Sequence, residues 1–488
     1  MNSQRGELAA IAAGLLYLVV LGWSVANVPY DIWGALVLVP IYGVTGILLM
    51  RRMFRGSQRA VATVMCWGLL IKLVGALARY WVGFEAYGGG TDASRYHNFA
   101  VESAGEVWSG DQSVIEVVPS GTGTAFLEHF TAFVYTLTGS SRLGGFITFA
   151  FLGFLGLAFF VKAAAIAVPR LALRKYAWFV VAFPSVVYWP SSIGKDAVVM
   201  FGLGVGTFGI AVMLSRGSWF GAVIFVGSGL GLAGLVRPHM AGVWLAAAVP
   251  ALILAFILGG RSKAIVGKRK TPNRFTVILI VGLAAVALSG VGSITTRFLD
   301  PGSEETGTSN FSDIIAETQR ISGKRGSTFE PPSISSPASW PYAAARTLTR
   351  PLPIEARGIA QLLSAAELVA LGGIYVVSWR RLRNLPAMLF TNPYVAFAMT
   401  ALFLGGLAYS SFANLGILAR QKSLLFPFML LAPCLPMWQR RKPDGPLDAS
   451  AAGSRRRQVV EETTPARVAA GGAAVPRWTA DDLDEFWS

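Results

Sequence analysis

About twelve apolar stretches recur along this chain, most of them close to the roughly 20 residues that a helix needs to cross a bilayer. Of the 488 residues, 53% are hydrophobic and only 14% are charged, a balance that a soluble domain rarely shows. We therefore expect an all-α, polytopic integral membrane protein. The candidate spans are Leu8–Val28, Trp33–Met50, Ala60–Val82, Gly144–Val168, Tyr176–Pro190, Ala197–Leu214, Phe220–Val236, Ala241–Gly260, Phe275–Ile294, Ile359–Trp379, Ala387–Ala408 and Leu424–Trp438.

The first stretch, Leu8–Val28, follows a single basic residue, Arg5, as a signal peptide would. It lacks a small-residue cleavage site before a polar region, and a second span follows almost at once, so we interpret it as a retained helix. Cys66 and Cys434 both lie inside apolar spans. This placement predicts neither a disulfide framework nor a zinc site.

Basic residues gather in alternate connectors. Because cytoplasmic loops usually hold the Lys and Arg residues, these connectors predict a multi-pass plasma-membrane protein with both termini in the cytoplasm. The same clustering explains the net charge of +16 without any nucleic-acid partner. The basic connectors contain Arg51/Arg52/Arg55/Arg59, Arg170/Arg174/Lys175, Arg261/Lys263/Lys268/Arg269/Lys270/Arg274, Arg380/Arg381/Arg383 and Arg440/Arg441/Lys442.

This topology depends on Thr124–Thr138, a short apolar segment that carries Glu128 and His129. At about 15 residues with two polar groups, it fits an interfacial or re-entrant helix better than a span. If it crossed the membrane, every later connector would change side.

The predicted transmembrane domain covers residues 1–442, with two long outer connectors at 83–143 and 295–358. Long ordered loops on a membrane scaffold commonly carry function. Residues 443–488 are rich in Ala, Gly, Arg and Pro and predict a disordered cytoplasmic tail. Its last residues, Trp478 to Trp487, combine acidic and aromatic character, so they either dock a cytoplasmic partner or form an inert end.

The first outer connector contains the run Gly88–His97, in which three glycines precede Thr91 and Asp92. A helix starting at Asp92 would place Tyr96 on the same face and His97 on another. The structural interpretation makes Thr91 or Asp92 an N-cap and Tyr96 an interfacial anchor. The functional one makes Asp92 and His97 catalytic, Asp92 as a general base or as the ligand of a divalent metal ion, with Tyr96 binding substrate.

Lys195 and Asp196 open a later span on the same outer side. The preceding turn is not a P-loop, because it lacks the upstream glycine and the Ser/Thr after the lysine. Asp196 serves either as a helix cap or in substrate binding. Lys195 lies at a helix N-terminus, where backbone N–H groups and the helix dipole favour a phosphate or pyrophosphate.

Arg237-Pro238-His239 ends one span and begins the next, again on the outer side. Arg237 is either a snorkelling anchor or a bidentate phosphate ligand. His239 titrates near neutrality, so it is a candidate proton donor or phosphate ligand.

Three further outer residues complete the expected substrate-binding set. Glu355 and Arg357 belong to the second long connector, and Arg420 precedes the last span. Arg420 and Lys422 either anchor a short helix or extend a basic ring with Lys195, Arg237 and Arg357.

Taken together, these motifs resemble bacterial polytopic glycan-assembly proteins, namely O-antigen and EpsG-like polysaccharide polymerases and the GT-C glycosyltransferases. The similar elements are Gly-Thr-Asp-x-x-x-Tyr at residues 90–96, Pro-Ser followed by Lys195-Asp196, Arg237-Pro238-His239, and Asn414-x-Gly416 followed by Arg420. They are scattered from about Tyr87 to Pro433.

The resemblance implies a GT-C- or polymerase-like fold and a glycosyltransferase or polymerase of the extracytoplasmic face. The donor would be a glycan on undecaprenyl phosphate or pyrophosphate, used with a glycan acceptor beside membrane lipids. Asp92 matches the acidic residue of the first outer loop in GT-C enzymes, and Arg237, Arg357 and Arg420 match the outer arginines of the polymerases. The paired acidic motif of many GT-C loops and a large soluble C-terminal domain are both absent.

Two other function classes remain open. A transporter or flippase of an anionic lipid-linked solute would place charges near the bilayer midplane, where Lys72, Lys162 and Glu367 are the main candidates. A non-catalytic scaffold for envelope assembly would recruit partners through Trp478–Trp487. The sequence identifies no cofactor beyond the divalent ion considered for Asp92.

Overall fold

The computed structural model describes residues 2–216, 220–262, 329–332, 334, 336–356 and 358–437. Helices and turns account for the ordered elements within these ranges, and none of the described residues forms a strand. The compact unit runs from Met1 to Pro436. The expected span Phe275–Ile294, Arg357 and the C-terminal tail lie outside the described residues.

The amino-terminal half contains the first eleven α-helices. They are α1 (Asn2–Asn27), α2 (Tyr30–Met53), α3 (Arg59–Trp81), α4 (Asp92–Ser109), α5 (Gly123–Thr138), α6 (Arg142–Ala167), α7 (Leu173–Ala182), α8 (Pro184–Tyr188), α9 (Lys195–Arg216), α10 (Phe220–Val236) and α11 (Pro238–Ser262), with the short turns η1 (Gly56–Gln58) and η2 (Val82–Ala86).

The carboxy-terminal half is built from shorter helices. They are η3 (Pro337–Ser339), α14 (Trp340–Leu348), η4 (Pro353–Glu355), α15 (Ile359–Val377), α16 (Trp379–Leu382), α17 (Leu385–Thr391), α18 (Pro393–Tyr409), α19 (Leu415–Lys422), α20 (Phe426–Met429) and η5 (Ala432–Cys434).

Among the described residues, five helices are long and apolar enough to cross a membrane, and two bent helix pairs raise the number to seven. This is the architecture of an all-α polytopic membrane protein. The sequence-based count of about twelve included shorter segments. Of the expected spans, Phe220–Val236 is an apolar helix of 17 residues, and Ala387–Ala408 is divided at Asn392 between α17 and the 17-residue apolar helix α18. Tyr176–Pro190 is broken at Pro184, and Leu424–Trp438 contains only the short helices α20 and η5 in its described part.

The centre of the bundle is formed by α6, α9 and α10, which pack side by side. Close contact between backbones is possible because the touching residues are small. A Cβ atom on Gly204 of α9 would lie 2.2 Å from the carbonyl oxygen of Gly156 in α6, and one on Gly202 would lie 2.6 Å from that of Gly229 in α10. Helix α9 is consequently the most enclosed candidate span, with 89% of its apolar window buried.

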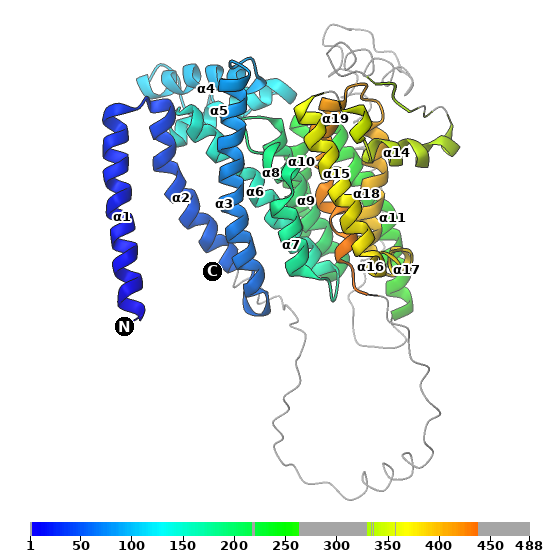
Figure 1. Ribbon diagram of the computed structural model, residues 1–488. Coiled ribbons are helices and arrows are strands. Elements are labelled where there is room, and N and C mark those ends of the chain that lie inside the picture. Colours follow the sequence, from blue (N-terminus) through cyan, green and yellow to red (C-terminus); the bar gives the residue numbers. More distant parts are fainter. Residues whose placement is uncertain are drawn as a thin grey trace, which may run out of the picture. The chain divides into compact units, whose positions relative to one another are not determined.

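Helices α4 and α5 pack against each other and lie across one end of the bundle, over α2 and α3 (Figure 1). The segment expected to be interfacial, Thr124–Thr138, is α5, and it does not qualify as a candidate span. This segment thus lies at the end of the bundle and is not one of its candidate spans.

Three of the five basic connectors meet at the other end of the bundle, which we call the basic end. Lys162 near the end of α6 donates to the Met53 carbonyl oxygen after α2. Lys175 donates to Ser378 over 2.9 Å, and Arg381 donates to the Leu435 carbonyl oxygen over 2.7 Å. The connectors around residues 51–59, 170–175 and 380–383 therefore lie at the same end of the bundle, which is the end of α2 and α6 far from α4 and α5.

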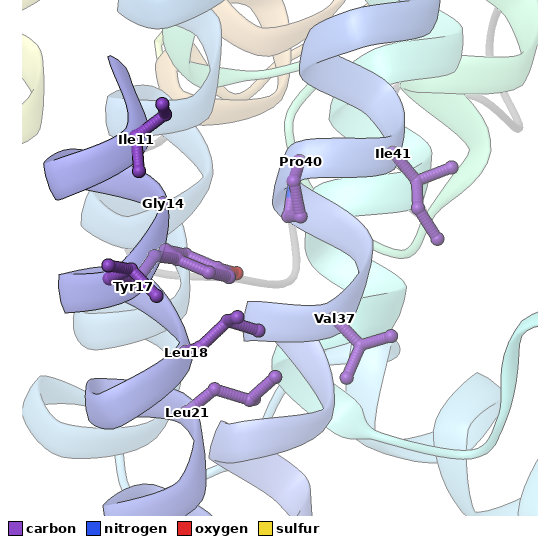
Figure 2. A pocket seen from close by; sticks show the side chains of 9 residues that line it. Ile11, Gly14, Tyr17, Leu18, Leu21, Val37, Pro40 and Ile41 are labelled. Carbon is purple, nitrogen blue, oxygen red and sulfur yellow. The ribbon is translucent and has the colours of Figure 1, made fainter. Parts of the chain in front are cut away.

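Helix α1 packs against α2 beside an apolar groove of about 620 Å³ (Figure 2). Pro40 in α2 cannot donate the backbone hydrogen bond that the Leu36 carbonyl would normally accept. The Tyr17 hydroxyl of α1 donates to that carbonyl instead. This contact ties α1 to α2 at the place where the proline interrupts the helix.

Candidate functional site

The most buried acidic side chain of the outer motifs is Asp196, in the first turn of α9. The turn Ser191–Gly194 is buried and leads directly into α9. A carboxylate in the first helical turn interacts favourably with the helix dipole and the exposed N–H groups. The Asp196 side chain is only 4% exposed, so its charge requires partners.

Two arginines from distant segments supply those partners. Arg237, between α10 and α11, places Nη2 2.7 Å from Oδ1 of Asp196. Arg420 of α19 donates from Nε to Oδ2 of the same carboxylate. Asp196 thus bridges two guanidinium groups that lie 183 positions apart in the sequence.

Arg420 also faces Asp92, the first residue of α4. Its Nη1 lies 3.6 Å from Oδ2 of Asp92. Helix α19 is fixed at its start by Asn414, whose side chain accepts from the backbone N–H groups of Gly416 and Ile417. The Asp92 side chain is 70% exposed, whereas that of Arg420 is 26% exposed. Arg420 therefore connects an exposed carboxylate to a buried one.

Lys195 approaches the same cluster from the start of α9. Its Nζ donates to Oγ1 of Thr124, in the first turn of α5, over 2.8 Å. Tyr96 of α4 also hydrogen-bonds Thr124, and burial followed by the Asp92 charge raises the pKa of Tyr96 to about 12. Thr124 therefore links the lysine to the predicted substrate-binding tyrosine.

Several buried polar atoms at this site have no hydrogen-bond partner within the described part of the chain. They include Nη1 of Arg237, Nε2 of His239 and Oγ1 of Thr91. Buried polar groups are normally paired, so the unpaired Nη1 of Arg237, on the guanidinium that contacts Asp196, suggests a position for a polar ligand or water. The donors on Arg237 and the oxygens nearby are suited to an anion that also carries hydroxyl groups.

His97 has different partners from Asp92, as a regular helix that starts at Asp92 predicts. Its Nδ1 lies 2.7 Å from the Tyr135 hydroxyl of α5, and its Nε2 lies 3.9 Å from Oδ1 of Asp31. Burial and the nearby Arg142 lower the pKa of His97 to about 4, against the opposing effect of Asp31. The helical turn of α4 directs residues 92 and 97 to different neighbours, and His97 instead joins α2, α4 and α5.

Glu355 is placed elsewhere as well. It forms an ion pair with Arg350 at 2.9 Å and accepts from the backbone N–H of Leu352, which stabilises the connector between α14 and α15. Lys422 is buried and donates to the carbonyl oxygens of Leu348 and Arg350. Lys422 thus binds the carbonyl oxygens at the end of α14 and does not extend the basic ring.

The described residues contain no group of three or more His, Cys, Asp or Glu side chains that would hold a metal ion. Asp92 and Asp196 approach the same side chain, Arg420, which occupies the space between them.

Sequence reasoning missed Thr124, which contacts both Lys195 and Tyr96. A threonine in the first turn of an amphipathic helix has no distinguishing pattern. The sequence did place Asp92, Lys195, Asp196, Arg237 and Arg420 on one side, and the structure brings these five residues into one cluster. Comparison with protein-family models, with curated proteins and with solved structures gave no match to this chain.

Proposed function

We propose that this protein is a membrane glycosyltransferase or polysaccharide polymerase that uses a polyprenyl-phosphate-linked sugar donor at the extracytoplasmic face of the plasma membrane. One observation carries the proposal: Asp92, Lys195, Arg237 and Arg420 converge around Asp196 at the bundle end opposite the basic connectors. The positive-inside rule assigns the basic end to the cytoplasm, so the cluster faces outward. We retain about twelve spans and a GT-C- or polymerase-like fold as part of this proposal.

The cationic groups suit a phosphate headgroup. Arg237 and Arg420 keep donors beyond those directed at Asp196, because a guanidinium carries five N–H groups. Lys195 stands at the start of α9, where the helix dipole adds to its charge. Asp196 holds both guanidiniums in place, so its part in binding is to orient the arginines. An anion at this point would meet fixed positive groups that need little reorganisation.

The exposed carboxylate of Asp92 suits the reaction itself. In the proposed step, an acceptor hydroxyl attacks the anomeric carbon of the donor and transfers its proton to Asp92. The bond between that carbon and the phosphate oxygen breaks, and the polyprenyl phosphate or pyrophosphate leaves with the bonding electrons. Lys195, Arg237 and Arg420 stabilise the developing negative charge. His239 lies next to Arg237 and serves as a phosphate ligand or proton donor.

The test compares variants in a knockout strain at equal protein level. Asp92→Asn is expected to reduce glycan assembly by about 10²- to 10⁴-fold, the usual contribution of a general base. Arg237→Ala is expected to abolish assembly and to let the prenyl-linked intermediate accumulate. The matched control is Arg95→Ala, one turn along α4 from Asp92, because Arg95 is exposed and pairs with Glu128 at 2.6 Å. Normal assembly in Asp92→Asn or Arg237→Ala would refute the assigned roles.

A second candidate, a transporter or flippase of an anionic lipid-linked solute, is favoured by one specific observation. The half-helix α8, which follows the break after α7, is bonded to the buried residues Lys72 and Glu367, and discontinuous helices with buried charges are common in transporters. Movement of the lipid-linked solute across liposomes containing only this protein would support this candidate. The scaffold hypothesis depends on the tail beyond the described residues.

A further inference from the structure

The segment between α7 and α9 is a short half-helix flanked by two prolines. Helix α7 ends at Ala182, α8 covers Pro184–Tyr188, and Pro190 follows before the buried turn that leads to Lys195. A proline has no backbone N–H, so each proline leaves a carbonyl oxygen without its helical donor. Inside a bilayer such groups must find partners in the protein.

Two buried charged side chains form hydrogen bonds with α8: Lys72 donates to a freed carbonyl oxygen, and Glu367 accepts from the first turn of the half-helix. Glu367 of α15 accepts the Ser185 backbone N–H at Oε1 over 2.6 Å and the Ser185 hydroxyl at Oε2. Lys72 of α3 donates from Nζ to the Val186 carbonyl oxygen over 2.7 Å and to that of Val187 over 3.3 Å. The Val186 carbonyl is the one that Pro190, four residues later, cannot serve.

Both charged residues sit near the middle of their helices. Lys72 is the fourteenth of 23 residues in α3, and Glu367 is the ninth of 19 in α15. Lys72 is 1% exposed and Glu367 is 6% exposed. Charges this deep in a membrane protein are costly and usually functional. Here their charged atoms are directed at the backbone of α8.

The half-helix is also seated closely on α3. A Cβ atom on Gly75 would lie 2.7 Å from Cγ1 of Val187 and 2.8 Å from its carbonyl oxygen. Only a residue without a side chain allows this approach. A larger residue at position 75 would push α8 away from α3 without removing any charge.

We propose that Lys72 and Glu367 are positioning residues that hold α8 in place, so that the turn 189–194 presents Lys195 to the anionic headgroup and holds Asp196 against the two arginines. Only six residues separate α8 from Lys195, and all six are buried or half-buried. A displacement of α8 would therefore also displace the first residues of α9. This inference rests on the proposed function, because it assumes that Lys195 and Asp196 belong to a phosphate site.

The experiment measures binding of undecaprenyl phosphate to the full-length protein in phosphatidylcholine nanodiscs, together with the thermal unfolding temperature. We expect Lys72→Met and Gly75→Val to weaken binding by about tenfold or more, because small displacements of binding groups carry large costs. The matched control is Lys162→Met. Lys162 is a second buried lysine that donates to a backbone carbonyl, at the basic end. Lys162→Met is expected to bind undecaprenyl phosphate normally, even if its unfolding temperature falls as far as that of Lys72→Met.

Two variants of Glu367 distinguish a positioning role from a role that requires its charge. Glu367→Gln keeps an oxygen for the Ser185 N–H and an amide that can donate to the Ser185 hydroxyl, so we expect binding close to that of the natural protein. Glu367→Leu loses both contacts and is expected to bind as weakly as Lys72→Met. A Gln variant as impaired as the Leu variant would overturn the positioning role and point to the ionised carboxylate.

Failure of this inference differs from failure of the proposed function. If the unaltered protein does not bind undecaprenyl phosphate, or if Arg237→Ala binds it equally well, the proposed phosphate site is wrong. If Arg237→Ala weakens binding while Lys72→Met and Gly75→Val do not, the site stands and the positioning role is refuted.

Discussion

Asp196 offers the sharpest test of the site, because one buried carboxylate holds two arginines. Asp196→Asn removes the negative charge and leaves Arg237 and Arg420 facing each other. At a charge separation of about 4 Å and an effective dielectric constant of about 20, each ion pair contributes about 4 kcal/mol of attraction. Desolvation offsets much of this gain, but breaking a buried pair from one side typically costs about 3–5 kcal/mol. We expect a loss of about that size in the free energy of unfolding.

The assay is unfolding of the purified protein by sodium dodecyl sulfate in mixed micelles, followed by the loss of tryptophan fluorescence. Asp92→Asn is the matched comparison, since Asp92 contacts the same Arg420 from an exposed position at 3.6 Å. That variant is expected to cost less than about 1 kcal/mol, as exposed ion pairs do.

A double variant tests the mechanism of the loss. Once the carboxylate is gone, removing one arginine relieves the repulsion, so Asp196→Asn combined with Arg237→Gln should be less destabilised than the sum of the single changes. The expected coupling is about 1–3 kcal/mol. Equal costs for Asp196→Asn and Asp92→Asn, or strict additivity in the double variant, would refute the reasoning.

Two further predictions concern the neighbouring contacts. Thr124→Val removes the oxygen that Lys195 contacts and is expected to weaken donor binding by about 3- to 10-fold, the effect of about one hydrogen bond. The control is Thr131→Val on the same helix, where the hydroxyl bonds within α5, and this variant should bind the donor normally. Equal binding by both variants would contradict the role of Thr124. His97 has a folded-state pKa of about 4, below the ordinary value of 6.5, so the unfolded chain takes up a proton first as pH falls. The contribution of His97 to the free energy of unfolding is therefore fully present above about pH 6.5 and is lost toward pH 4, by up to about 3 kcal/mol. A His97→Phe variant whose free energy of unfolding keeps the same dependence on pH would argue against this origin.

Much of the bundle was predictable because its signals are local. Apolar length located α2, α3, α6, α9 and α11 to within a few residues. Connector charge grouped the basic loops, and three of the five groups lie at the same end of the bundle. The count of spans was less secure, since Tyr176–Pro190 has the composition of a span but contains Pro184, which divides it.

The candidate site was predictable as a set of residues and unpredictable as a set of contacts. Topology placed Asp92 and Arg420 on one side, yet nothing in the sequence indicated that Arg420 and Arg237 share Asp196. His97 shows the opposite case: helical geometry alone predicted that it faces away from Asp92, and in α4 the two side chains have different partners.

The sequence by itself determined that the chain is a helical membrane protein and which charged residues collect at its two ends. These properties follow from the length, hydropathy and charge of individual segments, each of which acts almost independently in a bilayer. Only the tertiary structure decided the partners, such as Asp196 with Arg420, 224 positions apart, or Lys72 with the carbonyl of Val186. Such pairings depend on how closely helices pack and on where prolines leave backbone groups unpaired. The sequence of a single segment does not predict them.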